Sequence, residues 1–292
     1  MPDHDPLDFA ALWHSIAAQD SSGRHQAESD LAFWEENAQH FDQWHSDQEA
    51  TSRAVAAVSG LITDDVWTVL DVGAGTGRFA LPLAQQVDQV TALDASPNML
   101  KVLRRKVNER GSKNIQIVQS EWAEFATAQR FDLVLAAWSM YRQPDIMQGL
   151  RKLVDMTDKL LVIVDGDGYQ TPDRRLRREI WGGATKQTVP RAVLYLAILW
   201  QIGVRANVQT LWETRHTSGE SLHELAAQLA PKDTTVAERE QFAERLAPFT
   251  NRDEDGTLHY QAQIPFSLIT WRRHEDHAFL RAKGVTSTSP AP

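Results

Sequence analysis

The sequence predicts an α/β fold in which a mostly parallel sheet carries helices on both faces. From residue 67 onward, short apolar segments of strand type alternate with helical segments, and this alternation is typical of right-handed βαβ units. The first apolar segment ends in a glycine-rich turn, Gly73-Ala74-Gly75-Thr76-Gly77. Because ligands of parallel sheets bind at the carboxyl ends of the strands, we expect the functional site at this turn.

The composition is that of a globular protein with an acidic surface. The chain has 292 residues and a formal net charge of −9, so it can bury a large core but is poorly suited to nucleic acid, which needs a basic surface. It contains no cysteine, which excludes disulfides, thiolate metal sites and cysteine nucleophiles. The acidic N-terminus has no signal-peptide core, and the longest apolar run, 192–204, is too short to span a bilayer. We therefore expect a cytoplasmic protein without membrane contact.

Residues 1–60 are predicted to form an N-terminal helical cap. Asp5-Pro6 is a helix start, apolar residues recur at three- and four-residue steps between Leu31 and Trp44, and Ser46 with Glu49 has the spacing of a capping box for a third helix ending near Gly60. The aromatic side chains here are either plain core or a lid that excludes water from a bound cofactor. These residues are Trp13, Trp34, Phe41, Trp44 and, with them, His45.

The central strands follow in order. We predict them at 67–72, 90–93, 115–118, 131–136 and 160–164. Between the second and third of these strands, Ser96-Pro97 caps a helix that ends at Gly111.

After Asp165 the pattern loosens. Residues 167–190 are polar and basic, 190–202 is an apolar helix, and 206–212 and 263–271 are the last strands. Ser221 with Glu224, and Thr235 with Glu238, are capping boxes for two helices within 220–248. We assign 61–283 to one domain, with insertions 167–190 and 217–258 forming a substrate wall, and 284–292 to a disordered tail.

The acids beside the glycine turn suit a ligand with hydroxyl and cationic parts. Asp71 ends the first strand, and its charge would repel a pyrophosphate. Asp94 lies 17 positions after Gly77 at the end of the next strand, where a carboxylate accepts hydrogen bonds from a ribose diol. The alternatives are a turn cap for Asp71 and a helix N-cap for Asp94. Arg78 stands where a dinucleotide fingerprint needs its last glycine, which disfavours nicotinamide or flavin binding.

The run Val69–Gly77 resembles the first signature of class I S-adenosylmethionine-dependent methyltransferases, and the likeness extends over about residues 67–166. Residues 90–94 resemble the family's second strand with its ribose-binding acid, and 131–135 resemble its fourth strand. Glu121-Trp122 resembles the pair that frames the adenine. The resemblance implies a seven-stranded, mostly parallel, Rossmann-like methyltransferase sheet, with S-adenosylmethionine as cofactor and S-adenosylhomocysteine as product.

The three candidate adenine contacts, Glu121, Trp122 and Met99, also have a plain structural interpretation. Glu121 can be a helix N-terminal acid, and Trp122 and Met99 can be core residues. The residues that we predict to bind the cofactor are Asp71, Gly73, Ala74, Gly75, Thr76, Gly77, Asp94, Ala95, Met99, Glu121, Trp122, Ala137 and Trp138.

The segment 136–142 is where such enzymes present the methyl group. It lacks the Asn/Asp-Pro-Pro-Tyr signature of nucleobase and glutamine enzymes, the acid of polyamine-forming relatives and the carboxylate of magnesium-dependent catechol-type enzymes. We therefore predict a small-molecule methyltransferase that acts mainly through proximity and orientation. The alternatives are a protein or tRNA methyltransferase and a non-catalytic cofactor-binding protein.

The acceptor side is less defined. The basic run 173–178 is either a solvated helix face or a clamp for an anionic substrate. In Asp165-Gly166-Asp167-Gly168 the EF-hand pattern fails, so it is a turn unless one aspartate faces the substrate. The ten histidines show no ligand spacing, and we predict no metal. No general base is identified, and Tyr141, Tyr169 and His216 are candidate substrate contacts.

Overall fold

The computed structural model describes residues 8–19, 27–39, 48–166, 168–181, 190–231 and 234–273. Several predictions fall outside them: the helix start at Asp5-Pro6, the aromatic cap residues Phe41 and Trp44 with His45, Asp167, and the tail 284–292. Within the described segments, no helix is both long and apolar enough to cross a membrane.

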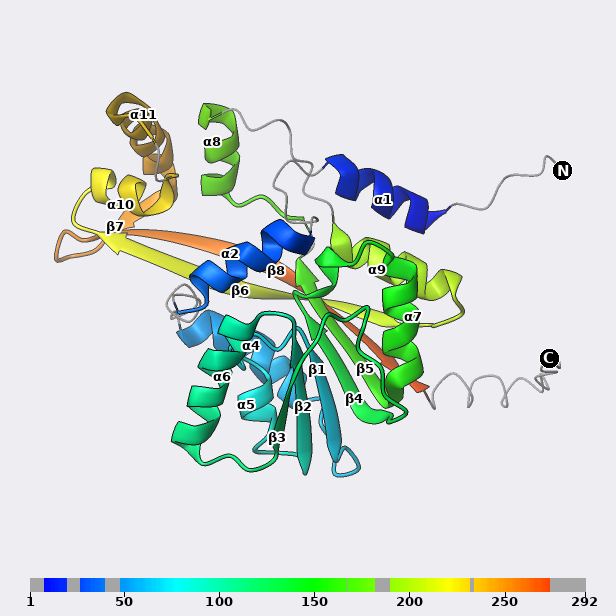
Figure 1. The fold of residues 1–292 in the computed structure, drawn as a ribbon. Coiled ribbons are helices and arrows are strands. Elements are labelled where there is room, and N and C mark those ends of the chain that lie inside the picture. The colour runs from blue at the N-terminus through cyan, green and yellow to red at the C-terminus, as the bar shows by residue number, and fades with distance from the viewer. Residues whose placement is uncertain are drawn as a thin grey trace, which may run out of the picture.

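One mixed sheet of eight strands forms the centre of the molecule, in the order β3-β2-β1-β4-β5-β8-β6, with β7 paired to β8 beside this path (Figure 1). The predicted α/β fold is confirmed, with eight strands instead of seven because the short β7 is added. The parallel strands are β1 (Thr68–Val72), β2 (Gln89–Asp94), β3 (Ile115–Gln119), β4 (Phe131–Ala137) and β5 (Thr157–Gly166). The antiparallel strands are β6 (Asn207–Gly219), β7 (Thr250–Arg252) and β8 (Leu258–Arg272).

Helices cover both faces of the sheet, as the alternation predicts (Figure 1). One face packs its alternate apolar residues against α4 (Gln48–Ser59), α5 (Ala80–Leu83) and α6 (Pro97–Arg110). The other face packs against α1 (Phe9–Gln19), α7 (Ile146–Met156) and α9 (Arg191–Gln201). Each central strand is apolar on both sides because both sides are covered.

Local capping chemistry sets the helix ends where the sequence predicts them. The Ser96 hydroxyl accepts from the Met99 amide, and Gly111 closes α6 in the left-handed conformation with φ 64°. Ser221 and Thr235 cap α10 (Leu222–Leu229) and α11 (Val236–Leu246), the latter through a complete capping box with Glu238.

The two long strands β6 and β8 are longer than predicted and extend beyond the parallel strands as an antiparallel pair. β6 and β8 pair continuously from Asn207 opposite Thr270 to Gly219 opposite Leu258. The far end of this strand pair packs against α8 (Pro172–Trp181), α10 and α11 around a separate apolar cluster that includes Phe242 and Tyr260 (Figure 1). The short elements η1 (Met140–Arg142) and η2 (Ala247–Phe249), with α2 (Ala27–Asn37), complete the described fold.

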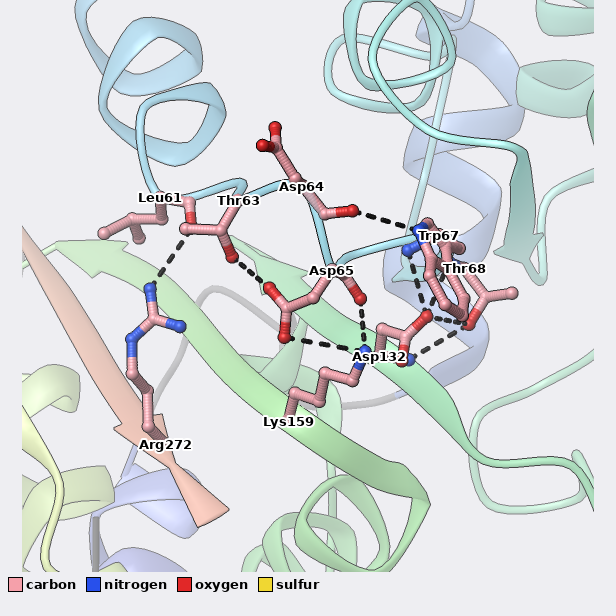
Figure 2. Close-up of polar contacts among 9 residues, drawn as sticks. All are labelled: Leu61, Thr63, Asp64, Asp65, Trp67, Thr68, Asp132, Lys159 and Arg272. Carbon is pink, nitrogen blue, oxygen red and sulfur yellow. Dashed lines mark hydrogen bonds and ion pairs between the residues drawn. The ribbon is translucent and has the colours of Figure 1, made fainter. Parts of the chain in front are cut away.

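A polar network joins the amino ends of β1, β4 and β5 (Figure 2). These ends lie at the edge of the sheet opposite to the carboxyl ends and the glycine turn. One oxygen of Asp132 accepts from the amides of Trp67 and Thr68, each at 3.0 Å, and from the Thr68 hydroxyl at 3.1 Å. Its other oxygen lies 3.0 Å from the Lys159 ammonium. Burial opposes ionisation, but these donors outweigh it and hold the pKa of Asp132 below its usual range.

We predict that Asp132→Ala lowers the free energy of unfolding by about 2–4 kcal/mol, because it removes several charge-assisted hydrogen bonds and leaves Lys159 with a weaker partner. This contribution is present above about pH 4, the unfolded carboxyl value, and is lost as the pH falls through the lower folded pKa. Urea unfolding at pH 7 and pH 3 measures both effects. Asp65→Ala is the matched control, since the exposed Asp65 lies 3.6 Å from Lys159 and should change stability little. Equal losses in the two variants would contradict the assignment.

Candidate functional site at the carboxyl ends of the strands

The glycine turn after β1 is pinned against the end of β2. The amides of Gly73 and Ala74 both donate to the Leu93 carbonyl, at 2.8 and 2.9 Å. Gly73, Gly75 and Gly77 all have positive φ, at 77°, 55° and 90°, a conformation that glycine adopts without strain. The chain therefore needs glycine here for its own geometry.

The three glycines differ in what surrounds them. A Cβ on Gly73 would lie 2.3 Å from the Ser139 Cβ, and one on Gly77 would lie 2.4 Å from a Leu103 methyl. A Cβ on Gly75 would meet nothing within 4 Å. Gly73 and Gly77 thus let the turn pack against the protein, while Gly75 presents bare backbone to open space. Of the other predicted turn residues, Ala74 and Thr76 are buried.

Asp94 ends β2 and faces the turn. Its carboxylate accepts from the Gly75 amide at 2.8 Å and from the Ser96 amide at 2.8 Å. Burial raises the pKa of Asp94, while these two amides and the charge of Arg142 oppose that rise. The structure therefore brings the two halves of the predicted site, turn and acid, into direct contact. The next residue, Ala95, is half-buried.

Asp71 is a buried acid behind the same turn. Its side chain is 2% exposed, and its Oδ2 has no hydrogen-bond partner. Burial and then the charge of Asp94 raise the pKa of Asp71 to about 7, although the Ala80 amide opposes this. An orphaned buried carboxylate oxygen is costly unless a ligand, proton or water satisfies it.

The end of β4 adds a strained backbone position. Trp138 has φ 49°, in the left-handed region that a bulky residue occupies only when its surroundings hold it there. Its amide donates to the Val164 carbonyl at 2.8 Å, and its indole packs against Phe79, Phe266 and the Arg78 guanidinium. The next hydroxyl, of Ser139, donates to the Val72 carbonyl at 2.6 Å. Ala137, the last residue of β4, is half-buried.

The predicted adenine residues make contacts within the protein. Glu121 forms an ion pair with Arg142 at 3.2 Å. Trp122 is 4% exposed in the core below α7, donates to the Gly149 carbonyl at 3.2 Å and packs against Phe125 and Lys152. Met99 is buried beside α2. Their contact with adenine stays a prediction.

Helix α2 lies across the carboxyl ends of the strands (Figure 1). On one side the Glu35 carboxylate accepts from the Ser96 hydroxyl at 2.5 Å and the Asn98 amide at 3.3 Å. On the other side the Trp34 indole donates to the Tyr141 hydroxyl at 2.9 Å. The helix thus connects the start of α6 with the segment after β4. Trp13, in contrast, is buried against Tyr195 in the core below α1.

The three candidate substrate contacts have different surroundings, and their contact with a substrate stays a prediction. Tyr141 is buried below the Arg191 guanidinium, whose central carbon lies 5.3 Å from the ring centre. Tyr169 is exposed and packs edge-on against Trp212. His216 is exposed on β6.

Several residues of the site were not predicted from the sequence. Arg142, Glu35 and Arg191 act through partners 21 to 63 positions away, and no local pattern gives such pairings. Asp165 had a signal, since like Asp94 it is an acid at a strand end. Among the described residues, no group of three or more histidine, aspartate and glutamate side chains is arranged to hold a metal ion.

Comparison with known proteins places this geometry in context. Residues 69–159 match the family model described as a methyltransferase domain. The chain is 34% identical over 95 residues to aklanonic acid methyltransferase of Streptomyces sp. strain C5, covering 31% of this chain and 43% of that protein. It is 36% identical over 89 residues to demethylmenaquinone methyltransferase of Listeria welshimeri, covering 29% of this chain and 38% of that protein. The chain therefore matches less than half the length of these two relatives.

A solved structure has the same fold. The magnesium protoporphyrin IX methyltransferase of Synechocystis PCC 6803, with bound SAH, superposes with a TM-score of 0.50 at 18% identity. The superposition covers 61% of this chain and 89% of that one.

The buried position of Asp71 gives a signed pH dependence. Its folded pKa of about 7 exceeds the unfolded value of about 4, so the ligand-free protein loses stability as the pH rises from about 4 to about 7. Asp71→Asn removes this loss, and its melting temperature should exceed that of the unchanged protein by a margin that grows from pH 5 to about pH 7 and then stays constant to pH 8. Thermal unfolding across that range measures the margin. A margin independent of pH, or one reproduced by Asp88→Asn at the exposed Asp88, would contradict the assignment.

Proposed function

We propose that this protein transfers the methyl group of S-adenosylmethionine to a small-molecule acceptor. The match of residues 69–159 to the family model described as a methyltransferase domain supports this proposal. The observation that carries the proposal is the contact between Asp94 and the Gly75 amide at 2.8 Å. It holds a carboxylate beside the half-buried backbone of Gly75, which suits a ligand with a ribose diol.

The residues around the turn fit this cofactor. Open space beside Gly75 leaves the backbone accessible to a ligand. The Oδ2 atom of the buried Asp71 has no hydrogen-bond partner. It therefore favours a ligand with a cationic amino group, which would donate to this oxygen directly or through a water. We assign Asp94 to the ribose, Asp71 to the amino-acid end and Glu121 to the adenine amine.

The mechanism that we propose depends mainly on position. S-adenosylmethionine supplies a methyl group that its positive sulfur already activates. The protein must hold the acceptor atom in line and exclude water, and proximity with orientation can supply roughly 7–11 kcal/mol. We assign the walls of this space to Trp138, which its surroundings hold in a strained conformation, and to Tyr141, whose hydroxyl accepts from Trp34 of α2. An acceptor that arrives protonated would also need a base.

Small-molecule acceptors are favoured over macromolecules. Two of the matched relatives are named for small acceptors, aklanonic acid and demethylmenaquinone. The net charge of −9 disfavours RNA. The arginines of the basic run, from Arg174 to Arg178, are solvent-exposed on α8, as in a solvated helix face.

Calorimetry with the full chain tests the cofactor assignment. We predict that S-adenosylmethionine and S-adenosylhomocysteine both bind, and that Asp94→Asn and Asp94→Ala weaken S-adenosylhomocysteine binding by about 10- to 100-fold, because charge-assisted hydrogen bonds to the ribose are lost. Glu109→Gln is the matched control, since it removes an exposed acid that forms an ion pair with Arg105 within α6. Circular dichroism confirms that each variant is folded. Failure of both ligands to bind below millimolar concentration would overturn the proposal, and unchanged affinity in the Asp94 variants would overturn the ribose assignment.

A further inference from the structure

A buried acid at the end of β5 holds an arginine in a fixed orientation. Asp165 is 1% exposed and accepts from Arg191 at the start of α9: Nε lies 3.1 Å from both carboxylate oxygens, and Nη2 lies 2.6 Å from Oδ1. The Tyr195 hydroxyl donates to Oδ2 at 3.0 Å, and the Gly166 amide donates to Oδ1 at 2.7 Å. The acid thus receives donors on both oxygens.

This saturation gives the two partners different roles. A carboxylate offers about four acceptor positions, and those of Asp165 are occupied. Asp165 therefore orients Arg191 and does not act as a base. Arg191 uses only the edge formed by Nε and Nη2. Its Nη1 makes no hydrogen bond among the described residues, and 31% of its side chain is exposed. The end-on edge formed by Nη1 and Nη2 is therefore available to a second planar oxyanion.

This edge lies beside the segment after β4, where we expect the methyl acceptor to bind. The guanidinium lies over the ring of Tyr141 with its carbon 5.3 Å from the ring centre, and Tyr141 follows the end of β4. Burial opposes the charge on Arg191, but Asp165 outweighs it and raises the pKa of the guanidinium above its ordinary value. The edge formed by Nη1 and Nη2 is therefore permanently charged. Its orientation is fixed by the Asp165 carboxylate and by the ring of Tyr141.

We propose that Arg191, positioned by Asp165 and Tyr195, binds a carboxylate group of the methyl acceptor. The inference rests on the proposed function, since it names the substrate class of that site. A single carboxylate fits the planar edge in bidentate fashion. Because Asp165 already compensates the charge on Arg191, this edge favours a monoanion over a dianion. A dianionic phosphate would add repulsion from Asp71 and Asp94.

This assignment moves the predicted anion clamp away from the basic run of α8. Arg174 and Arg177 are exposed, and the one buried acid of that helix, Asp173, pairs instead with Arg215 of β6 at 2.7 Å. Among the described residues, no side-chain hydrogen bond or ion pair orients Arg174 or Arg177, whereas Arg191 is held by the buried Asp165 carboxylate and lies over the ring of Tyr141.

Titration of the full chain with sodium benzoate tests the subsite. We expect benzoate to bind more tightly than the neutral benzamide, with and without S-adenosylhomocysteine. Arg191→Lys keeps a cation beside Asp165 but removes the second bidentate edge, and it should weaken benzoate binding about tenfold or more while S-adenosylhomocysteine affinity stays unchanged. Arg174→Lys is the matched control and should change neither.

The outcomes separate the two proposals. Benzoate that binds no better than benzamide, or equally well to Arg191→Lys, overturns the subsite even if S-adenosylhomocysteine binds normally. Loss of benzoate binding in Arg174→Lys returns the clamp to α8. If S-adenosylhomocysteine fails to bind while benzoate binding still depends on Arg191, the methyltransferase proposal fails and the carboxylate subsite stands. Should Arg191→Lys unfold, Tyr195→Phe, which loosens Asp165 alone, must weaken benzoate binding, and an unchanged affinity there overturns the proposal.

Discussion

The contact between the glycine turn and the end of β2 is the constraint on which the site depends. The Leu93 carbonyl accepts from the amides of Gly73 and Ala74, and the Asp94 carboxylate accepts from the amide of Gly75. These bonds require positive φ along the turn, which glycine supplies. These hydrogen bonds leave the Gly75 backbone open beside the Asp94 carboxylate. Without them the turn and the acid would not meet at the carboxyl edge of the sheet.

The same contact places two acidic side chains in a buried part of the site. Asp71 and Asp94 end neighbouring strands, so pairing β1 with β2 brings two acids together, and burial raises the pKa of both. The charge of Arg142, which pairs with Glu121, opposes the rise of the Asp94 pKa. A cationic, hydroxyl-bearing ligand relieves that cost, which is a physical reason for this geometry to favour S-adenosylmethionine over a pyrophosphate-containing cofactor.

The sequence could predict what local chemistry determines. Apolar strand segments, the caps at Ser96 and Gly111, and the spacing from Gly77 to Asp94 are short-range features, and they gave the parallel sheet and the meeting of turn and acid. Distant pairings were out of reach: Arg191 with Asp165, Trp34 with Tyr141, and the extension of β6, whose half-exposed polar residues 213–219 have no strand-like apolar pattern. Trp122 shows a further limit, because core packing and ligand stacking demand the same residue type.

The most direct measurement of the central claim is a crystal structure of the full chain with S-adenosylhomocysteine. The account predicts that both ribose hydroxyls lie within hydrogen-bond distance of the Asp94 carboxylate, that the ligand backbone passes over Gly75, and that the amino group satisfies the buried oxygen of Asp71 directly or through one water. A ligand bound elsewhere, or one at the turn with its ribose away from Asp94, would contradict it.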